Sequence, residues 1–397
     1  MSRFDSYINT AEKLIGTFKG ERPFAVYLKN FFSANKKYGS QDRRSITALC
    51  YNYFRIGFAG PGIPFREKIL IATFLCETAP SELMENLKPE WNKKISGTLK
   101  EKLAVTGPEF LLSDIFPFYK ELSGGIERTG FCKSFLIQPD LFLRIRPHTR
   151  VSVLKKLARS KLAWNMKGED CVQLTNSDKV EDLFIIDKEV VVQDYNSQKV
   201  LDYLKNGSLL TKSQKDNLKP DLAIWDTCAA SGGKSILLND LFNIKIDLTV
   251  SDIRANIILI LHRRFKKAGI KEYKYFITDI TSPDFNPGDS GFDLVVCDAP
   301  CTGSGTWGRT PEQLCYFEES SIREYSTLQK RIIGGSMPHL KQGGLFIYIT
   351  CSVFKQENEM ISEYITEKFN CSLLEQQLLK GYDKKADNMF TAVFRKL

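Results

Sequence analysis

Apolar residues recur at helical spacing through about the first 125 positions of the chain. Within residues 45–55 they fall at i, i+3, i+4, i+7 and i+8, which is one face of a helix, namely Ile46, Leu49, Cys50, Tyr53 and Phe54. Similar patches recur at residues 24–32, 69–76 and 99–103, and Pro61, Gly62 and Pro64 break the chain between helices. The pattern predicts a helical domain over residues 1–128.

The pattern changes near Gln138, where short strand-like runs begin. Residues 141–147 predict a strand ended by Pro147, and a helix is expected at residues 150–159. Two further strand-like runs lie at residues 171–174 and 188–193. Together they predict a small α+β module over residues 129–212. The lysine-rich stretch 211–219, ended by Pro220, is expected to be a connection.

Residues 213–397 are predicted to form a doubly wound α/β domain, because apolar strands alternate with helices from Asp221 onward. Strands are expected at residues 222–228, 246–251, 274–278, 292–297, 345–350 and 390–394, with helices at 235–242 and 253–267. This alternation indicates a mostly parallel sheet. In such sheets the ligand binds at the carboxyl ends of the strands, so that edge is where chemistry is expected.

Composition narrows the class of protein. Hydrophobic residues make up 43% of the chain and charged residues 26%, which is typical of a soluble protein with sizeable cores. Residues 1–18 mix charged and polar residues with apolar ones, so no signal peptide is predicted. No stretch approaches the roughly 20 apolar residues of a membrane-spanning helix. A cytoplasmic protein is therefore expected.

The net charge of +9 is compatible with a polyanionic partner, although charge alone does not identify one. The ten cysteines are scattered and form no CxxC pair, and the chain has only three histidines, His148, His262 and His339. Neither a disulfide framework nor a zinc site is expected from this pattern. Most of the cysteines are predicted to be small buried apolar residues.

The first strand of the α/β region leads into a turn of small residues, DTCAASGGKS at residues 226–235. Such a turn lets the backbone approach a ligand closely, and the following helix N-terminus supplies amide donors. The alternative is a tight turn that needs glycine only for its own geometry. The GxxxxGK[ST] spacing of a phosphate-binding P-loop is absent.

Acidic residues follow the next three predicted strands. Asp252 could bind ribose hydroxyls or cap the following helix. Asp279 could accept a hydrogen bond from an exocyclic amine or cap a turn, and Asp298 ends the fourth strand. Because the carboxyl ends of parallel strands meet at one edge of the sheet, four polar strand ends together favour a nucleoside-containing ligand.

Two of the cysteines, Cys301 and Cys351, follow the fourth and fifth strands in loops of small polar residues. A buried core residue is the usual role of a single cysteine, but this setting is unlike a core. A thiolate added to carbon 6 of cytosine makes carbon 5 able to attack an electrophilic methyl group, and a base then removes the carbon 5 proton. A free thiol titrates at about 8.5 and needs local activation. Asp298 could hydrogen-bond the ring N3 and amino group.

The blocks at residues 226–234, 298–305 and 348–353 resemble the signature motifs of the Sun family of RNA (cytosine-C5)-methyltransferases, most closely its RsmB type, which methylates small-subunit ribosomal RNA. Upstream, VQDYNSQ at residues 192–198 resembles the family's VQDxxSQ stretch before the catalytic domain, and Gln138-Pro139 with LRI at residues 143–145 resembles the start of its small RNA-binding module. SQDRR at residues 40–44 resembles its NusB-like helical domain. The resemblance covers almost the whole chain and implies a Rossmann-like class I methyltransferase domain over residues 213–397.

The same resemblance implies the cofactor, the partner and the site residues. S-adenosyl-L-methionine would be the cofactor and ribosomal RNA the favoured partner of a monomer without metal. The implied cofactor loop is Cys228, Ala229, Ala230, Ser231, Gly232, Gly233 and Lys234. Asp252 would bind ribose, Asp279 would lie near adenine, and Asp298 would lie near both the methyl donor and the cytosine. Cys351 would be the nucleophile, and Cys301 would assist product release.

Two departures from the family pattern bear on the substrate. Ser231 stands where the family usually has proline, and TWGRTP at residues 306–311 replaces a basic pair before Asn/His-Pro. Transfer RNA is the alternative substrate. A non-catalytic RNA-binding assembly factor is the alternative from another class, against which the intact Cys301, Cys351 and Asp298 argue. A small-molecule methyltransferase does not account for the roughly 220 residues before the α/β region.

Overall fold

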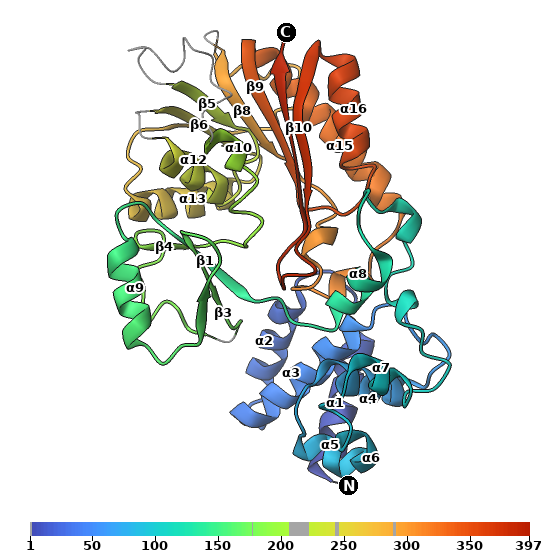
Figure 1. Cartoon of the computed structure of the whole chain (residues 1–397). Helices are drawn as coiled ribbons and strands as arrows, with labels where there is room; N and C mark the ends of the chain where they lie inside the picture. Colours follow the sequence, from blue (N-terminus) through green and yellow to red (C-terminus); the bar gives the residue numbers. More distant parts are fainter. Residues whose placement is uncertain (1, 177, 206–221, 243–245, 289–290) are drawn as a thin grey trace. The chain divides into compact units, whose positions relative to one another are not determined.

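The computed structural model describes residues 2–176, 178–205, 222–242, 246–288 and 291–397, and Figure 1 shows the chain. The chain forms two compact units. The helical unit consists of Met1–Lys120, Ile126–Gln138 and Thr306–Glu319, and the sheet unit consists of Glu121–Gly125, Pro139–Gly305 and Ser320–Leu397. The expected connection at residues 211–219 and the domain boundary beside it lie outside the described residues.

The helical unit consists of short helices packed around an aromatic core. Phe24 and Phe54 meet edge to face with ring centroids 4.9 Å apart, and Phe18 packs against both rings. The elements are α1 (Arg3–Thr17), α2 (Phe24–Ala34), α3 (Ser40–Arg55), α4 (Phe65–Cys76), α5 (Glu82–Leu87), α6 (Pro89–Asn92), α7 (Leu99–Leu103), the 3₁₀ turns η1 (Leu112–Ile115) and η2 (Tyr119–Glu121), α8 (Arg128–Phe135) and α14 (Glu312–Cys315). The helices expected at residues 24–32, 45–55, 69–76 and 99–103 all form.

The segment Thr306–Glu319 belongs to the helical unit although it follows the fourth strand of the α/β region. Arg55, which is 3% exposed, donates to the carbonyl oxygens of Phe135 at 2.9 Å and Gly308 at 3.0 Å. The Glu312 carboxylate accepts from the backbone amide of Phe24 at 3.2 Å. A buried guanidinium needs acceptors, and this segment supplies one of them. The compact units therefore divide the chain differently from the three predicted domains.

The small α+β module lies in the sheet unit. Its antiparallel sheet has the order β2-β3-β1-β4 and packs against α9 (Arg150–Arg159). Its strands are β1 (Leu141–Ile145), β2 (Trp164–Met166), β3 (Cys171–Leu174) and β4 (Val190–Val192). Asp240 on α12 (Gly233–Leu241) accepts hydrogen bonds from Arg144 at 2.6 Å and Arg146 at 3.1 Å, so this buried cluster joins the module to the larger sheet.

The larger sheet has seven strands in the order β10-β11-β9-β8-β5-β6-β7. The five strands from β9 to β7 pair in parallel, and the β10–β11 and β11–β9 pairs are antiparallel, which confirms the expected mostly parallel, doubly wound sheet. The strands are β5 (Leu222–Asp226), β6 (Ile246–Asp252), β7 (Lys274–Ile277), β8 (Phe292–Asp298), β9 (Leu340–Thr350), β10 (Cys371–Leu379) and β11 (Met389–Lys396). Strand β10 was not predicted, because Glu375, Gln376 and Gln377 interrupt its apolar pattern at the exposed edge of the sheet.

Helices cover both faces of this sheet (Figure 1). One core lies under α12 and α13 (Ala255–Ala268), where Ile236 and Leu261 pack against the strands. The other lies under α15 (Ser320–Ser336) and α16 (Glu359–Lys368), where Ile333 and Ile365 are fully buried. Short elements η3 (Ser304–Thr306), η4 (Met337–His339) and α10 (Asp202–Lys205) complete the described part. Within it, no helix is long and apolar enough to cross a membrane.

Candidate active site

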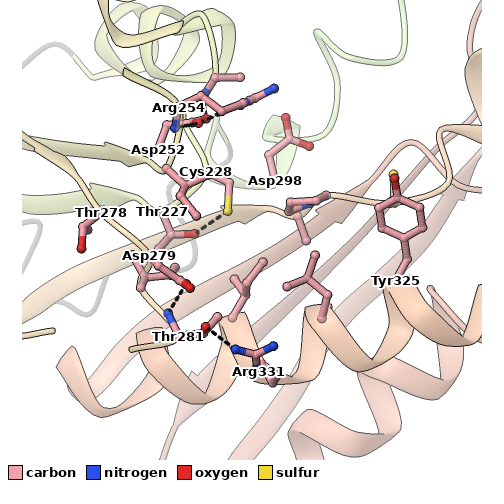
Figure 2. A pocket seen from close by; sticks show the side chains of 18 of the residues that line it. Thr227, Cys228, Asp252, Arg254, Thr278, Asp279, Thr281, Asp298, Tyr325 and Arg331 are labelled. Atoms are coloured by element: carbon pink, nitrogen blue, oxygen red, sulfur yellow. Dashed lines mark hydrogen bonds and ion pairs between the residues drawn. The ribbon is translucent and has the colours of Figure 1, made fainter. Parts of the chain in front are cut away.

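A cavity of about 570 Å³ opens at the carboxyl ends of the parallel strands, the edge predicted from the sequence (Figure 2). The residues after β5, β6, β7, β8 and β9 and one face of α15 form its walls. They are Thr227, Cys228, Ala230, Asp252, Ile253, Arg254, Thr278, Asp279, Ile280, Thr281, Asp298, Ala299, Pro300, Cys301, Tyr325, Leu328, Arg331, Ile332 and Cys351. The structure therefore brings together the four strand-end acidic and polar positions and both predicted cysteines.

The turn between β5 and α12 passes along one wall of the cavity. Gly232 has φ +85° and precedes the first residue of α12. A Cβ at this position would lie 2.7 Å from Cε1 of Phe265, so glycine is required both for the backbone conformation and for the packing. Cys228 and Ala230 line the cavity, whereas Ala229, Ser231, Gly232, Gly233 and Lys234 are not among its lining residues. The backbone carbonyl and hydroxyl of Ser231 accept hydrogen bonds from Arg264 instead.

Asp252 at the end of β6 is nearly buried and its carboxylate is held by three donors. Arg254 donates to it through the backbone amide and the guanidinium, each at 2.9 Å, and Ala230 donates its amide at 3.0 Å. Burial opposes the charge, but the hydrogen bonds from Arg254 outweigh it and lower the pKa of Asp252. The helix begins after Arg254, so the interpretation of Asp252 as its N-cap is wrong. The Asp252 carboxylate, which lines the cavity, is therefore favoured in its ionised form.

Asp279, after β7, is exposed on the cavity wall. Its carboxylate accepts from the backbone amide of Thr281 at 2.9 Å, and the hydrogen bonds from Thr281 lower the pKa of Asp279. The turn-capping role considered for this residue is therefore present alongside its position in the cavity. Arg331 donates to the Thr281 hydroxyl at 2.8 Å, which links this wall to α15 (Figure 2).

Asp298 at the end of β8 forms an ion pair with Lys234, with 2.9 Å between Nζ and Oδ2. Burial opposes the charge of Lys234, but its attraction to Asp298, with smaller contributions from Cys351 and Asp226, raises the pKa of Lys234. The lysine of the predicted cofactor loop does not itself line the cavity, but it pairs with Asp298, which does. It places a positive charge beside the residues expected to meet the methyl donor and the base.

The two cysteines lie in contact. The Sγ atoms of Cys301 and Cys351 are 3.4 Å apart, both thiols are free, and both line the cavity. The hydrogen bond with Cys351 and burial raise the pKa of Cys301 well above its usual value, and the nearby Glu357 carboxylate adds to this rise. One proton shared between two touching sulfurs allows one of them to act as a thiolate while the other stays protonated.

Backbone contacts fix the relative position of the two cysteine loops. The amide of Gly305 donates to the carbonyl oxygen of Cys351 at 2.8 Å, and Asn388 donates to the carbonyl oxygen of Gly305 at 2.9 Å. A Cβ at Gly305 would lie 2.2 Å from the carbonyl oxygen of Asn388, so only glycine fits. The amide of Ala299 donates to Ile349 at 2.9 Å, which holds the two strand ends together just before the loops.

Sequence reasoning missed several residues of the site. Tyr325, Leu328, Arg331 and Ile332 share one face of α15 at spacings of three, three and one, a helical signal that was available in the sequence. Glu357 is buried behind both cysteine loops, and a single acidic residue in a turn carries no signal that singles it out. In the described part of the chain, no group of three or more His, Cys, Asp or Glu side chains could hold a metal ion.

The strand order and the cavity at the carboxyl ends of the strands define a Rossmann-like, doubly wound α/β domain. The crystal structure of PH0851 matches this chain with a TM-score of 0.70 at 19% identity, covering 98% of each chain. NSun6 from Pyrococcus horikoshii with SFG matches with a TM-score of 0.57 at 16% identity, covering 70% of this chain and 96% of that one. At these identities the likeness shows the fold, which confirms the fold class expected from the sequence.

Residues 214–393 match the family model of the 16S rRNA methyltransferases RsmB/F. This stretch spans less than half of the chain and is similar to the RsmB/F family that the motif blocks indicated. Ribosomal RNA small subunit methyltransferase B of Serratia proteamaculans is 30% identical over 252 residues, which cover 60% of this chain and 54% of that protein. The chain thus spans about half the length of this curated relative.

Proposed function

We propose that the protein transfers a methyl group from S-adenosyl-L-methionine to carbon 5 of a cytosine in RNA, with small-subunit ribosomal RNA as the favoured substrate. The observation that carries this proposal is the contact between two free thiols, 3.4 Å apart, on the wall of the strand-end cavity. The RsmB/F family match and the relative from Serratia proteamaculans support ribosomal RNA as the substrate class.

The cavity suits the proposed cofactor. Its volume of about 570 Å³ is in the usual range for a pocket that takes a small ligand. Asp252 would accept hydrogen bonds from the ribose hydroxyls, in place of part of its present pairing with Arg254, and the backbone at Cys228 and Ala230 would hold the amino acid part. Asp279 would lie near the adenine. When bound, the cofactor would supply an electrophilic methyl group.

Within this proposal the residues at the inner end divide the chemistry. The thiolate of Cys351 attacks carbon 6 of the cytosine and forms a covalent bond, which makes carbon 5 nucleophilic. Asp298 accepts a hydrogen bond from the cytosine amino group and is itself oriented by Lys234 at 2.9 Å. After methylation, a base takes the carbon 5 proton, the electron pair of that C–H bond restores the double bond as the Cys351 thiolate leaves, and Cys301 assists this release.

The assignment of the two cysteines can be tested with a pair of variants and labelled cofactor. We expect Cys351→Ala to abolish methyl transfer to unmodified RNA, because no covalent bond to carbon 6 can form. Cys301→Ala should accumulate a protein–RNA adduct that survives denaturing electrophoresis. An adduct with Cys351→Ala and none with Cys301→Ala would exchange the roles of the two residues. No incorporation into any ribosomal RNA by the wild-type protein would favour a non-catalytic RNA-binding factor.

The substrate class needs a separate measurement. Mapping of 5-methylcytosine in cellular RNA after deletion of the gene should show a mark lost from small-subunit ribosomal RNA. Loss from transfer RNA with ribosomal RNA unchanged would contradict the ribosomal assignment, while leaving the proposed reaction intact.

A further inference from the structure

A fully buried carboxylate, that of Glu357, lies behind the wall of the cavity and receives four hydrogen bonds. Its Oε1 accepts from the backbone amide of Thr302 at 2.9 Å and from the side-chain amide of Gln329 at 3.0 Å. Its Oε2 accepts from the Thr302 hydroxyl at 2.6 Å and from the Ser352 hydroxyl. The carboxylate therefore connects three separate parts of the chain: two loops and α15.

The two loops held in this way are those that carry the cysteines. Thr302 directly follows Cys301, and Ser352 directly follows Cys351. The Glu357 carboxylate thus bridges the two loops on the side away from the cavity. The two Sγ atoms lie 3.4 Å apart at the cavity wall. Glu357 therefore contacts both cysteine loops, although it is not among the residues that line the cavity.

Two of the groups that meet the Glu357 carboxyl group are N–H donors, and the other two are hydroxyls. Ser352 accepts a hydrogen bond from the backbone amide of Phe354 at 3.0 Å, so its own hydrogen is free to point to Glu357. Thr302 and Gln329 present N–H donors to the other oxygen. Burial raises the pKa of Glu357, and the hydrogen bonds from Ser352 and Thr302 oppose that rise. An ionised Glu357 accepts hydrogen bonds from all four groups, whereas a protonated Glu357 would require one hydroxyl to turn and accept instead.

The charges around the two thiols are unequal. The titratable groups that interact with the cysteine pair come from several elements, namely Glu357, Tyr325 of α15, Tyr348 of β9 and Lys234 of α12, and Asp298 of β8 pairs with Lys234. Of these, the Glu357 anion acts on Cys301 and raises its pKa, in addition to the effects of Cys351 and burial. The Lys234 cation acts on Cys351. The Glu357 carboxylate therefore disfavours a thiolate at Cys301, whereas Lys234 and Cys351 attract each other.

We propose that Glu357 is a positioning residue that holds the two cysteine loops together and whose charge keeps their shared proton on Cys301, so that Cys351 carries the thiolate. The inference rests on the proposed function only for what each cysteine does to the cytosine. The placement of the proton is a property of the free protein. The different roles of the two adjacent thiols then follow from the charged groups that surround them.

The test measures alkylation of each cysteine by iodoacetamide as a function of pH, with peptide mass spectrometry to separate Cys301 from Cys351. In Glu357→Gln the hydroxyls of Thr302 and Ser352 can turn to accept from the amide, so the loops should keep their positions. Without the negative charge, the alkylation rate of Cys301 at about pH 7.5 should rise roughly fivefold, because the rate follows the thiolate fraction. The matched control is Glu363→Gln on the exposed face of α16, which should leave both profiles unchanged.

The wild-type protein provides a second measurement that does not depend on the folding of a variant. Alkylation of Cys351 should begin at lower pH than alkylation of Cys301. Reversed order in the wild-type protein, or an unchanged Cys301 profile in folded Glu357→Gln, would overturn the proposal. Neither measurement uses RNA or cofactor. A failure of the proposed effect of Glu357 can therefore be distinguished from a failure of the proposed methyl transfer.

Discussion

Lys234 donates a hydrogen bond to Asp298 at 2.9 Å, joining the first turn of α12 to the carboxyl end of β8. The Lys234 side chain is largely buried, and its ammonium group also interacts with Cys351. The Lys234 ammonium group thus orients the Asp298 carboxylate, which is proposed to hold the cytosine. The same group interacts with Cys351, the thiol proposed to attack the cytosine. The turn at Gly232 and Gly233, which precedes Lys234 and passes along the cavity, therefore also helps to place this lysine beside Asp298.

Replacing Lys234 by methionine keeps most of the side-chain volume and removes the charge. We expect methyl transfer to fall by about 10- to 100-fold, since hydrogen bonds to charged groups contribute roughly 1.5–3 kcal/mol. The initial rate with saturating RNA and cofactor is the measurement. Lys274→Met, which removes an exposed lysine paired with Asp247, is the control and should keep the wild-type rate. Equal rates of methyl transfer for both variants would show that the Lys234–Asp298 pair does not contribute to the reaction.

Asp252→Ala should weaken binding of S-adenosyl-L-methionine by about 10- to 100-fold, because two charge-assisted hydrogen bonds to the ribose would be lost. Isothermal titration calorimetry in the absence of RNA measures this directly. Arg254→Gln is the informative companion, since the arginine now occupies the same carboxylate. It should bind the cofactor at least as tightly as the wild type. Unchanged affinity in Asp252→Ala would place the ribose elsewhere.

Gly305→Ala should damage both stability and activity, because the new Cβ would meet the carbonyl oxygens of Asn388 and Cys351 at 2.2 Å and 2.8 Å. Overpacking of this kind costs about 1–3 kcal/mol of unfolding free energy, measurable by urea denaturation. Gly334→Ala on α15 is the matched control, since nothing lies within 4 Å of its Cβ position. A helical alanine there should be neutral or stabilising by up to about 1 kcal/mol.

Asp240→Ala leaves the buried guanidinium groups of Arg144 and Arg146 without their shared counter-charge. Removing one partner of a buried ion pair costs about 3–5 kcal/mol, so the urea midpoint of the sheet unit should fall sharply. The comparison is Asp247→Ala, which breaks an exposed pair with Lys274 and should cost less than about 1 kcal/mol. Similar midpoints for the two variants would mean that water reaches the arginine cluster.

Asp226 makes stability depend on pH. Burial raises its pKa from 3.8 to about 7, while the hydroxyl of Ser235 donates to it at 2.6 Å and partly offsets this effect. The folded state therefore holds this proton more tightly than the unfolded state, so its stabilising contribution is complete below about pH 4 and is lost as the pH rises through 7. The difference is about 4 kcal/mol.

Asp226→Asn cannot titrate at this position. Urea unfolding at several pH values should therefore show that the free energy of unfolding falls less between pH 4 and pH 8 in the variant than in the wild type. Relative to the wild type, the variant should thus be more stable at pH 8 than at pH 4. Parallel pH profiles for the two proteins would show that Asp226 stays ionised when buried.

Much of this protein follows from its sequence alone. The period of apolar residues was enough to place helices, and alternating strands and helices predicted the doubly wound sheet, because both patterns arise from burial of one face of each element. The rule that ligands bind at the carboxyl ends of parallel strands then located Asp252, Asp279, Asp298, Cys301 and Cys351 around one cavity.

Only the tertiary structure decided how these residues act on one another. Strand β10, rich in polar residues, pairs at the sheet edge where backbone hydrogen bonds replace an apolar pattern. The Lys234–Asp298 pair and the Glu357 network join residues 64 and 55 positions apart, and no local spacing predicts such contacts. Sequence patterns record what each element buries, whereas the charges felt by a thiol depend on which distant elements the folded chain packs beside it.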